Sequence, residues 1–251
     1  MTTSVAKVTL ASMQQMKRDR RKIAAVVAWD IQIAQIVDRI GVEIVSVGDS
    51  VGQQLWGHAS PLEVTLDEMI IVCKAVRRGV ARALVSCDFP PGVLPRGREA
   101  ALEAARRLAD EAGADLVKIE GARHSPEAIT AIAHAGIPVF AQMEPTPGAD
   151  PVDEARCLEA AGAALIDFKY SGPDAGAAVA AAVAVPVLGG LGGGPWLDGR
   201  LRMAHAAIGY AASNVDSPAD AYANVARVTF DALSAYVDDV RAGRQIKGAR
   251  P

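Results

Sequence analysis

The sequence has few of the residues that build disulfide frameworks or membrane spans. Among its 251 residues there are only three cysteines, Cys73, Cys87 and Cys157, and their wide spacing matches neither a zinc site nor a set of disulfides. No apolar run reaches the roughly 18 residues that a membrane-spanning helix requires. The basic segment ending at Lys22 is not followed by the cleavable apolar core of a secretion signal. We therefore expect a cytoplasmic protein that does not enter a membrane.

Aromatic residues and net charge are also scarce. Aromatic side chains make up 4% of the chain and the formal net charge is −3, so we expect no basic surface for nucleic acid. The hydrophobic content is nevertheless 51% and is mostly aliphatic, which is typical of a parallel sheet packed against helices. Because no linker or low-complexity stretch interrupts the sequence, we expect residues 1–251 to form one domain.

Apolar strand-like runs alternate with helical stretches along the chain. Seven such units and a weaker eighth, at a spacing of roughly 25 residues, are typical of a (β/α)8 TIM barrel, with a doubly wound sheet as the alternative. A further helix is expected at each end, at residues 3–20 and 218–241. The expected strands are residues 23–29, 43–47, 83–87, 115–119, 138–141, 164–168, 186–189 and 201–205.

A glycine-rich segment carries polar groups directly after the second expected strand. It reads Val47-Gly-Asp-Ser-Val-Gly-Gln-Gln-Leu-Trp-Gly-His58, with Asp49 and Ser50 between two glycines. Glycine permits positive φ and close approach of the backbone, so we expect a tight loop here. The loops at the carboxyl ends of strands are where α/β proteins place their chemistry.

Three carboxylates, Asp49, Asp88 and Glu120, each follow the end of an expected strand. In a barrel these strand ends are neighbours on one face, where three carboxylates would raise each other's pKa. Mg²⁺ would relieve that repulsion, since it takes oxygen ligands and keeps waters that a substrate can replace. The alternative for each acid is a loop cap or an exposed surface position. Lys118 shares a strand face with Glu120, where it would hold a substrate carboxylate or form an ion pair with one of the acids.

The motifs around these residues resemble the ketopantoate hydroxymethyltransferase family of the phosphoenolpyruvate mutase/isocitrate lyase superfamily. The resemblance runs from about residue 20 to residue 209, and its strongest parts include Val47-Gly-Asp-Ser-Val-Gly, Ala75-Val-Arg-Arg-Gly79, Asp88-Phe-Pro, Val117-Lys-Ile-Glu-Gly121, Thr146-Pro147 and Pro186-Val-Leu-Gly. It implies a barrel that forms a homo-oligomer, often a decamer. It also implies transfer of a hydroxymethyl group from methylenetetrahydrofolate to a small 2-oxo acid, as in pantothenate biosynthesis.

The resemblance also assigns roles to individual residues. Asp49, Asp88 and Glu120 would form the Mg²⁺ site, the two aspartates also facing the substrate. Ser50 and Lys118 would contact the carboxylate and the oxo group of the 2-oxo acid.

The chain departs from the family pattern after the fifth and sixth strands. Gln142 stands where the family has a histidine, at a substrate-binding position, and Lys169 stands where it has a catalytic glutamate. The long loop that usually follows Pro147 is missing, which leaves the use of methylenetetrahydrofolate open. A lysine near carboxylates is a poor base, so Lys169 would bind a second anionic group, form a Schiff base or be inert. Asp167, on the same strand face, is the alternative base.

Three functions remain open at this point. The first is a Mg²⁺-dependent hydroxymethyltransferase that acts at the carbon next to the carbonyl of a 2-oxo acid of the 3-methyl-2-oxobutanoate type, through enolate chemistry. The second is a metal-dependent lyase or decarboxylase, because loss of an aldehyde or CO2 generates an enolate without removal of a C–H proton. The third is a catalytically silent homologue that retains the barrel.

Overall fold

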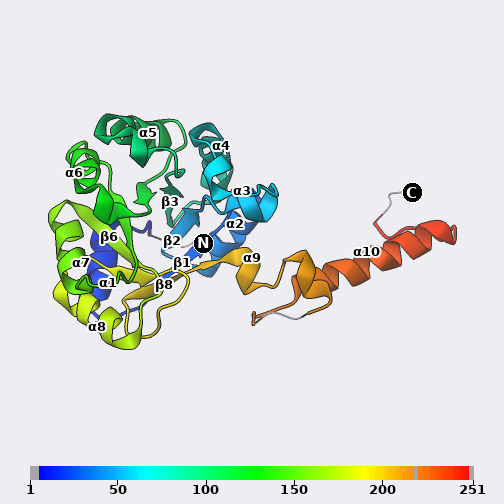
Figure 1. Cartoon of the computed structure of the whole chain (residues 1–251). Coiled ribbons are helices and arrows are strands. Elements are labelled where there is room, and N and C mark those ends of the chain that lie inside the picture. The colour runs from blue at the N-terminus through cyan, green and yellow to red at the C-terminus, as the bar shows by residue number, and fades with distance from the viewer. Residues whose placement is uncertain (1–5, 218–219, 249–251) are drawn as a thin grey trace. The chain divides into compact units, whose positions relative to one another are not determined.

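Eight parallel strands form a closed barrel in the computed structural model, which describes residues 6–217 and 220–248 (Figure 1). Each strand pairs with its neighbours in chain order, which confirms the (β/α)8 barrel and excludes the doubly wound sheet. The strands are β1 Ile23–Val27, β2 Ile44–Val47, β3 Leu84–Asp88, β4 Leu116–Ile119, β5 Val139–Met143, β6 Ala163–Phe168, β7 Val187–Gly189 and β8 Gly199–Met203.

Helices follow the strands, and many of them begin where the sequence supplies a cap. Thr65 and Glu68 form a capping box at the start of α4, and α6, α7 and α8 each begin with proline in the first turn. The helices are α1 Leu10–Arg18, α2 Ile31–Ile40, α3 Val51–Leu55, α4 Leu66–Gly79, α5 Arg98–Asp110, α6 Pro126–His134, α7 Pro151–Ala160, α8 Pro173–Ala182, α9 Ala204–Ala207 and α10 Val225–Arg241. The 3-10 turns are η1 Pro61–Glu63, η2 Leu94–Arg96, η3 Ala122–His124 and η4 Ala212–Val215.

The barrel interior changes from apolar to polar toward the carboxyl ends of the strands. Residues two apart share a face of a strand, so Leu116 and Lys118 on β4, and Leu165 and Asp167 on β6, are successive inward positions. All four side chains are buried. Leu116 and Leu165 pack in the core of the barrel. Lys118 and Asp167, two residues further along each strand, bring charge into the mouth of the barrel, where the candidate site lies.

The glycine-rich segment after β2 differs from the expected tight loop, because residues Val51–Leu55 form α3. Neither Gly48 nor Gly52 has a positive φ. Gly52 is required for another reason, since a Cβ atom there would overlap Cγ2 of Val64 and lie 2.8 Å from Nδ1 of His58. Close packing, not an unusual backbone conformation, therefore explains this glycine.

Several other boundaries also differ from the expected ones, among them the end of β1 at Val27 and the end of β5 at Met143. Strand β8 lies at 199–203 rather than 201–205, because Gly199 lets the backbone pass against the carbonyl of Ile23, which a Cβ atom would overlap. Helix α10 begins at Val225 after the cap of Asn224, not at residue 218, which lies outside the described residues. Helix α1 begins at Leu10, and of its expected start at 3–9 the first three residues also lie outside them.

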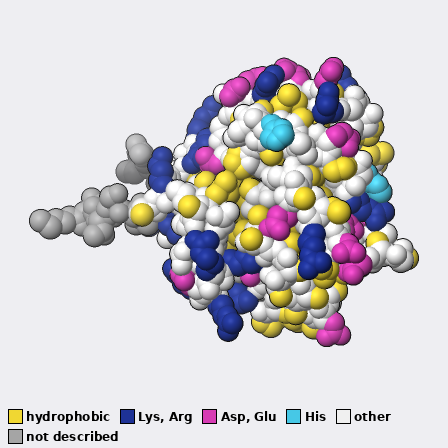
Figure 2. Space-filling view, turned by 90° about the vertical axis from the view of Figure 1, so that its left-hand side faces the viewer, with side chains coloured by type: hydrophobic (Ala, Val, Ile, Leu, Met, Phe, Trp, Pro, Cys, Tyr) yellow, Lys and Arg dark blue, Asp and Glu magenta, His cyan; other side chains and the backbone are white. Residues whose placement is uncertain are grey.

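The chain divides into two compact units, residues 1–202 and 203–251. The first contains the barrel and the second contains α9, η4 and α10. The expectation of one domain stays a prediction. Within the described part of the chain, no helix is long and apolar enough to cross a membrane. Basic and acidic side chains are interspersed over much of the face shown in Figure 2.

Candidate active site

The structure brings together the three carboxylates expected at the ends of neighbouring strands. Asp49 and Glu120 follow β2 and β4, and Asp88 is the last residue of β3. One oxygen of each carboxylate lies within 4.8 Å of the others. Their role as metal ligands stays a prediction, but the geometry on which it depends is present.

Asp88 is the most deeply buried member of this group, with 4% of its surface exposed. Its Oδ2 accepts a hydrogen bond of 3.1 Å from Nζ of Lys118, whereas its Oδ1 is buried and has no hydrogen-bond partner. Burial raises the pKa of Asp88 to about 7, with Lys118 opposing and the carboxylates of Asp49 and Glu120 adding to the rise. A buried oxygen without a partner is unfavourable, and three oxygen donors around it fit a hard divalent cation such as Mg²⁺.

Asp49 is half-buried and is affected by charges from several strands. Burial raises its pKa, and the carboxylate of Glu120 raises it further. Lys118, the backbone N–H of Ser50 and Lys169 act in the opposite direction. The carboxylate of Asp49, after β2, is thus close enough to be affected by charged side chains on or after β4 and β6.

Lys118 lies between several carboxylates, in agreement with the expected alternative that it forms an ion pair with one of the acids. Its Nζ is 3.1 Å from Oδ2 of Asp88, 3.7 Å from Oε1 of Glu120 and 3.7 Å from Oδ2 of Asp167. Burial by itself would lower the pKa of Lys118, but these three carboxylates together raise it well above its ordinary value. Lys118 is therefore an ammonium ion whose charge is shared by the protein's own acids, and its contact with a substrate stays a prediction.

Asp167 and Gln142 form a hydrogen-bonded link across β5, β6 and the loop after β7. The side-chain amide of Gln142 donates to Oε1 of Glu120 at 3.1 Å and to Oδ2 of Asp167 at 3.2 Å. The backbone N–H of Gly190 donates to Oδ1 of Asp167 at 2.7 Å. Both oxygens of Asp167 are thus engaged, and its side chain is almost wholly buried. The expected role of Asp167 as a base and that of Gln142 in substrate binding are not tested by this geometry.

Gly190 is the site residue that sequence reasoning missed. A Cβ atom at this position would lie 3.0 Å from both carboxylate oxygens of Asp167, so a larger residue would require the carboxylate or the loop to move by a few tenths of an ångström. The run Gly189-Gly-Leu-Gly-Gly-Gly194 was the available signal. The sequence of this run does not by itself indicate which of its glycines faces the site.

Lys169 and Ser50 lie on opposite sides of the barrel mouth, after β6 and β2. Lys169 is half-buried, its backbone N–H donates to the carbonyl of Met143 at 2.9 Å, and its Nζ is 5.6 Å from the centroid of the Tyr170 ring. Among the described residues, no carboxylate forms an ion pair with it. Ser50 is the N-cap residue of α3, and its side chain makes no capping hydrogen bond.

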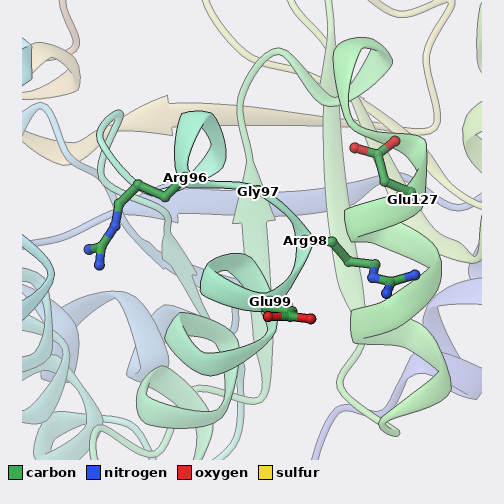
Figure 3. A pocket seen from close by; sticks show the side chains of 5 residues that line it. All are labelled: Arg96, Gly97, Arg98, Glu99 and Glu127. Atoms are coloured by element: carbon green, nitrogen blue, oxygen red, sulfur yellow. The ribbon is translucent and has the colours of Figure 1, made fainter.

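A separate cavity of about 400 Å³ lies near the start of α5 (Figure 3). Its lining residues are exposed, and the side chains of Arg96 and Arg98 point away from one another on either side of Gly97. They therefore do not form a two-sided clamp for an anion. Glu99 and Glu127 complete the lining.

Comparisons with known proteins point to one family. A family model described as ketopantoate hydroxymethyltransferase matches residues 7–152 and 146–245. The 3-methyl-2-oxobutanoate hydroxymethyltransferase of Geobacillus thermodenitrificans is 34% identical over 251 residues, covering 93% of this chain and 90% of that protein. The protein of the same name from a Cyanothece strain is 35% identical over 254 residues, covering 93% and 96%. The two matched segments of the family model meet near Pro147, where the chain lacks the expected loop.

Solved structures share the fold at lower sequence identity. The crystal structure of 2,3-dimethylmalate lyase, a member of the PEP mutase/isocitrate lyase superfamily, has a TM-score of 0.66 at 15% identity and covers 97% of this chain and 92% of that one. Oxaloacetate acetylhydrolase in complex with oxalate has a TM-score of 0.64 at 11% identity and covers 92% and 86%. At these identities the likeness supports the barrel alone.

Proposed function

Since the chain belongs to the ketopantoate hydroxymethyltransferase family, we propose that it transfers a hydroxymethyl group to the carbon next to the carbonyl of a small 2-oxo acid. The meeting of Asp49, Asp88 and Glu120 in the barrel mouth supports this proposal most directly. Two relatives carry 3-methyl-2-oxobutanoate in their name, so that acid is the first acceptor to test. Methylenetetrahydrofolate is the donor that the family implies, and the missing loop makes it the component most in need of measurement.

We propose that the same three carboxylates hold Mg²⁺. All the donors are oxygens, and Oδ1 of Asp88 is buried without any other partner. The bound ion would stabilise the negative charge that develops on the oxo oxygen of the acid. Burial is the main reason that the pKa of Asp88 and of Asp49 is raised, and repulsion between the carboxylates raises both further. The bound ion would also relieve this repulsion.

The chain's own residues must then accept a proton from C3 of the acid. In this step the C3–H bond breaks and the proton passes to a base. Water cleaves the C–N bonds of methylenetetrahydrofolate, so that tetrahydrofolate leaves and formaldehyde is released. The electron pair of C3 then forms the bond to the formaldehyde carbon, while the C=O π pair goes to the oxygen, which takes up a proton and becomes the new hydroxyl. We propose Asp167 as the base, because it is the carboxylate in the mouth that is not among the three metal ligands. Gln142 and the N–H of Gly190 hold it in place. A lysine is an ammonium ion at neutral pH, which leaves Lys169 for another role.

One observation favours a second function. Both oxygens of Asp167 already accept hydrogen bonds from the protein, so a proton from C3 must compete with the side chain of Gln142 or the N–H of Gly190. Cleavage of a 2-oxo acid with loss of CO2 or an aldehyde requires no base at C3. A metal-dependent lyase or decarboxylase is therefore the alternative to be tested beside the transferase.

We also propose that the protein forms a homo-oligomer through α10. Phe230, Leu233, Val237 and Val240 recur on one face of this helix at steps of three and four residues, and they are 49%, 58%, 36% and 47% exposed. Such a stripe is typical of helices that pack against another helix, and a second copy offers the matching stripe. Light scattering after gel filtration should give a mass above the 26.1 kDa of one chain. The mass should be lower for the Leu233→Asp variant. The family resemblance implies ten copies.

Proton NMR of 3-methyl-2-oxobutanoate in D2O tests the proposed chemistry. With protein and Mg²⁺ the C3 hydrogen should exchange for deuterium, and addition of methylenetetrahydrofolate should give the hydroxymethylated acid. An Asp88→Asn variant serves as the control. A folded, Mg²⁺-binding protein that exchanges no C3 hydrogen of any 2-oxo acid would reject the transferase. Release of CO2 or an aldehyde instead would support the lyase.

A further inference from the structure

The two lysines in the barrel mouth have different surroundings. Lys118 is 4% exposed and lies within 4 Å of three carboxylates. Lys169 is half-buried, and within the described part of the chain no acid forms an ion pair with it. Its Nζ lies over the Tyr170 ring, 5.6 Å from the centroid. A partly desolvated ammonium without a counter-ion beside a reaction site is suited to an anion supplied by the ligand.

The position of Lys169 directs its charge toward the centre of the mouth. Leu165 and Asp167 are alternate, inward-facing residues of β6, and Lys169 is the first residue after this strand ends at Phe168. The hydrogen bond from its backbone N–H to Met143 fixes the start of the side chain beside β5. Asp49, which its charge affects, lies after β2, four strands away in a ring of eight and thus on the opposite side. Lys169 therefore lies across the space that a substrate would enter.

Once a divalent cation is bound, the charges of the mouth do not repel a substrate with more than one negative group. When all are ionised, four carboxylates and two ammonium groups leave two negative charges, which one divalent cation balances. The loaded mouth is then neutral. If an acidic residue replaced Lys169, the metal-loaded mouth would carry two negative charges and would repel a doubly negative ligand.

On the basis of the proposed function, we propose that Lys169 binds a second carboxylate of the acceptor. The preferred substrate is then a 2-oxo acid whose side chain carries a terminal carboxylate, in preference to one with an aliphatic side chain. Lys118 cannot serve this purpose without leaving the acids that already surround it. Lys169 is thus the residue that determines specificity at this site.

A matched pair of acids isolates the second carboxylate. 2-Oxoglutarate and 2-oxopentanoate have the same five-carbon chain and differ only at its end. We would measure KM and kcat for exchange of the C3 hydrogens in D2O with Mg²⁺, using wild type, Lys169→Gln, Lys169→Arg and, as a surface control, Lys7→Gln. In wild type and Lys7→Gln, we expect KM for 2-oxoglutarate to be about tenfold lower than KM for 2-oxopentanoate. The preference should largely vanish in Lys169→Gln and be retained in Lys169→Arg.

Different outcomes separate this inference from the function on which it rests. Equal KM values in wild type, or a preference that survives in Lys169→Gln, would overturn the role of Lys169 while leaving the transferase intact. Loss of all exchange in both Lys169 variants would point to a Schiff base instead and would also overturn it. If no acid exchanges with any form, the proposed function fails. Calorimetric titration with 2-oxoglutarate then decides, since binding lost in Lys169→Gln but kept in Lys169→Arg supports the site, and binding unaffected by either rejects it.

Discussion

The two sides of the barrel mouth carry different kinds of polar group. At the ends of β2, β3 and β4, acids crowd together, one buried oxygen has no partner and the pKa of Asp88 is raised by burial to about 7. At the ends of β5, β6 and β7, both oxygens of Asp167 and the side-chain NH2 group of Gln142 are hydrogen-bonded, and Lys169 has no carboxylate counter-ion among the described residues. The first side is suited to a cation and the second to an anion, which is the polarity that a metal-bound, negatively charged substrate requires.

Asp88→Asn should have the largest effect, because it removes one of the proposed Mg²⁺ ligands from the side suited to a cation. We expect Mg²⁺-dependent exchange of the C3 hydrogen to fall by about a thousandfold, as loss of several kcal/mol of charge stabilisation implies. Mg²⁺ should also no longer raise the melting temperature of this variant. If Mg²⁺ stabilises the variant as well as wild type, Asp88 is not a ligand.

Lys118→Met should destabilise the fold, since it leaves buried acids without their cation. Removal of one partner from a buried ion pair costs about 3 to 5 kcal/mol, measured as the change in the free energy of unfolding in urea. Mg²⁺ should recover part of this loss by supplying positive charge to the same acids. Arg156→Met, which breaks an exposed ion pair with Asp153, is the control and should cost less than about 1 kcal/mol. Equal losses in the two variants would contradict the distinction.

The stability of the metal-free protein should fall as the pH rises. The pKa of Asp88 is raised to about 7 in the fold, chiefly by burial, against roughly 3.9 in an unfolded chain. Its protonated form therefore stabilises the fold fully below about pH 4, and this contribution is lost as the pH rises through 7. We expect a loss of about 2 kcal/mol between pH 5 and pH 8 in EDTA, absent in Asp88→Asn. A rise in stability over this interval in wild type would show that Asp88 is ionised throughout.

Gly190→Ala tests the hydrogen-bonded side with the smallest expected effect. The new methyl group would lie 3.0 Å from both oxygens of Asp167, so the loop must move away and weaken the bond from its N–H. We expect a loss of about 1 to 2 kcal/mol in the free energy of unfolding. Gly92→Ala is the matched control, because a Cβ atom there meets nothing within 4 Å. An equal change in the two variants would show that the contact with Asp167 contributes little.

Much of the barrel could be predicted because its strands are apolar runs bounded by turn residues. The strand that was placed two residues late, β8, carries exposed Arg200 and Arg202, which obscured its alternation. Its position depends on contact between Gly199 and Ile23, which are far apart in the sequence. The convergence of Asp49, Asp88 and Glu120 followed from the fold class, since consecutive parallel strands end at the same edge.

By itself, the sequence determined the fold class and the acids that would meet, because local periodicity and strand order specify these without any knowledge of side-chain contacts. The family followed from the resemblance of its motifs. Only the tertiary structure decided how the charges are shared. It placed Lys118 among three acids and left Lys169 without one, and it used the N–H of Gly190 to hold Asp167. These outcomes depend on distances of a few ångströms between residues on different strands, and electrostatic and hydrogen-bond energies change steeply over such distances.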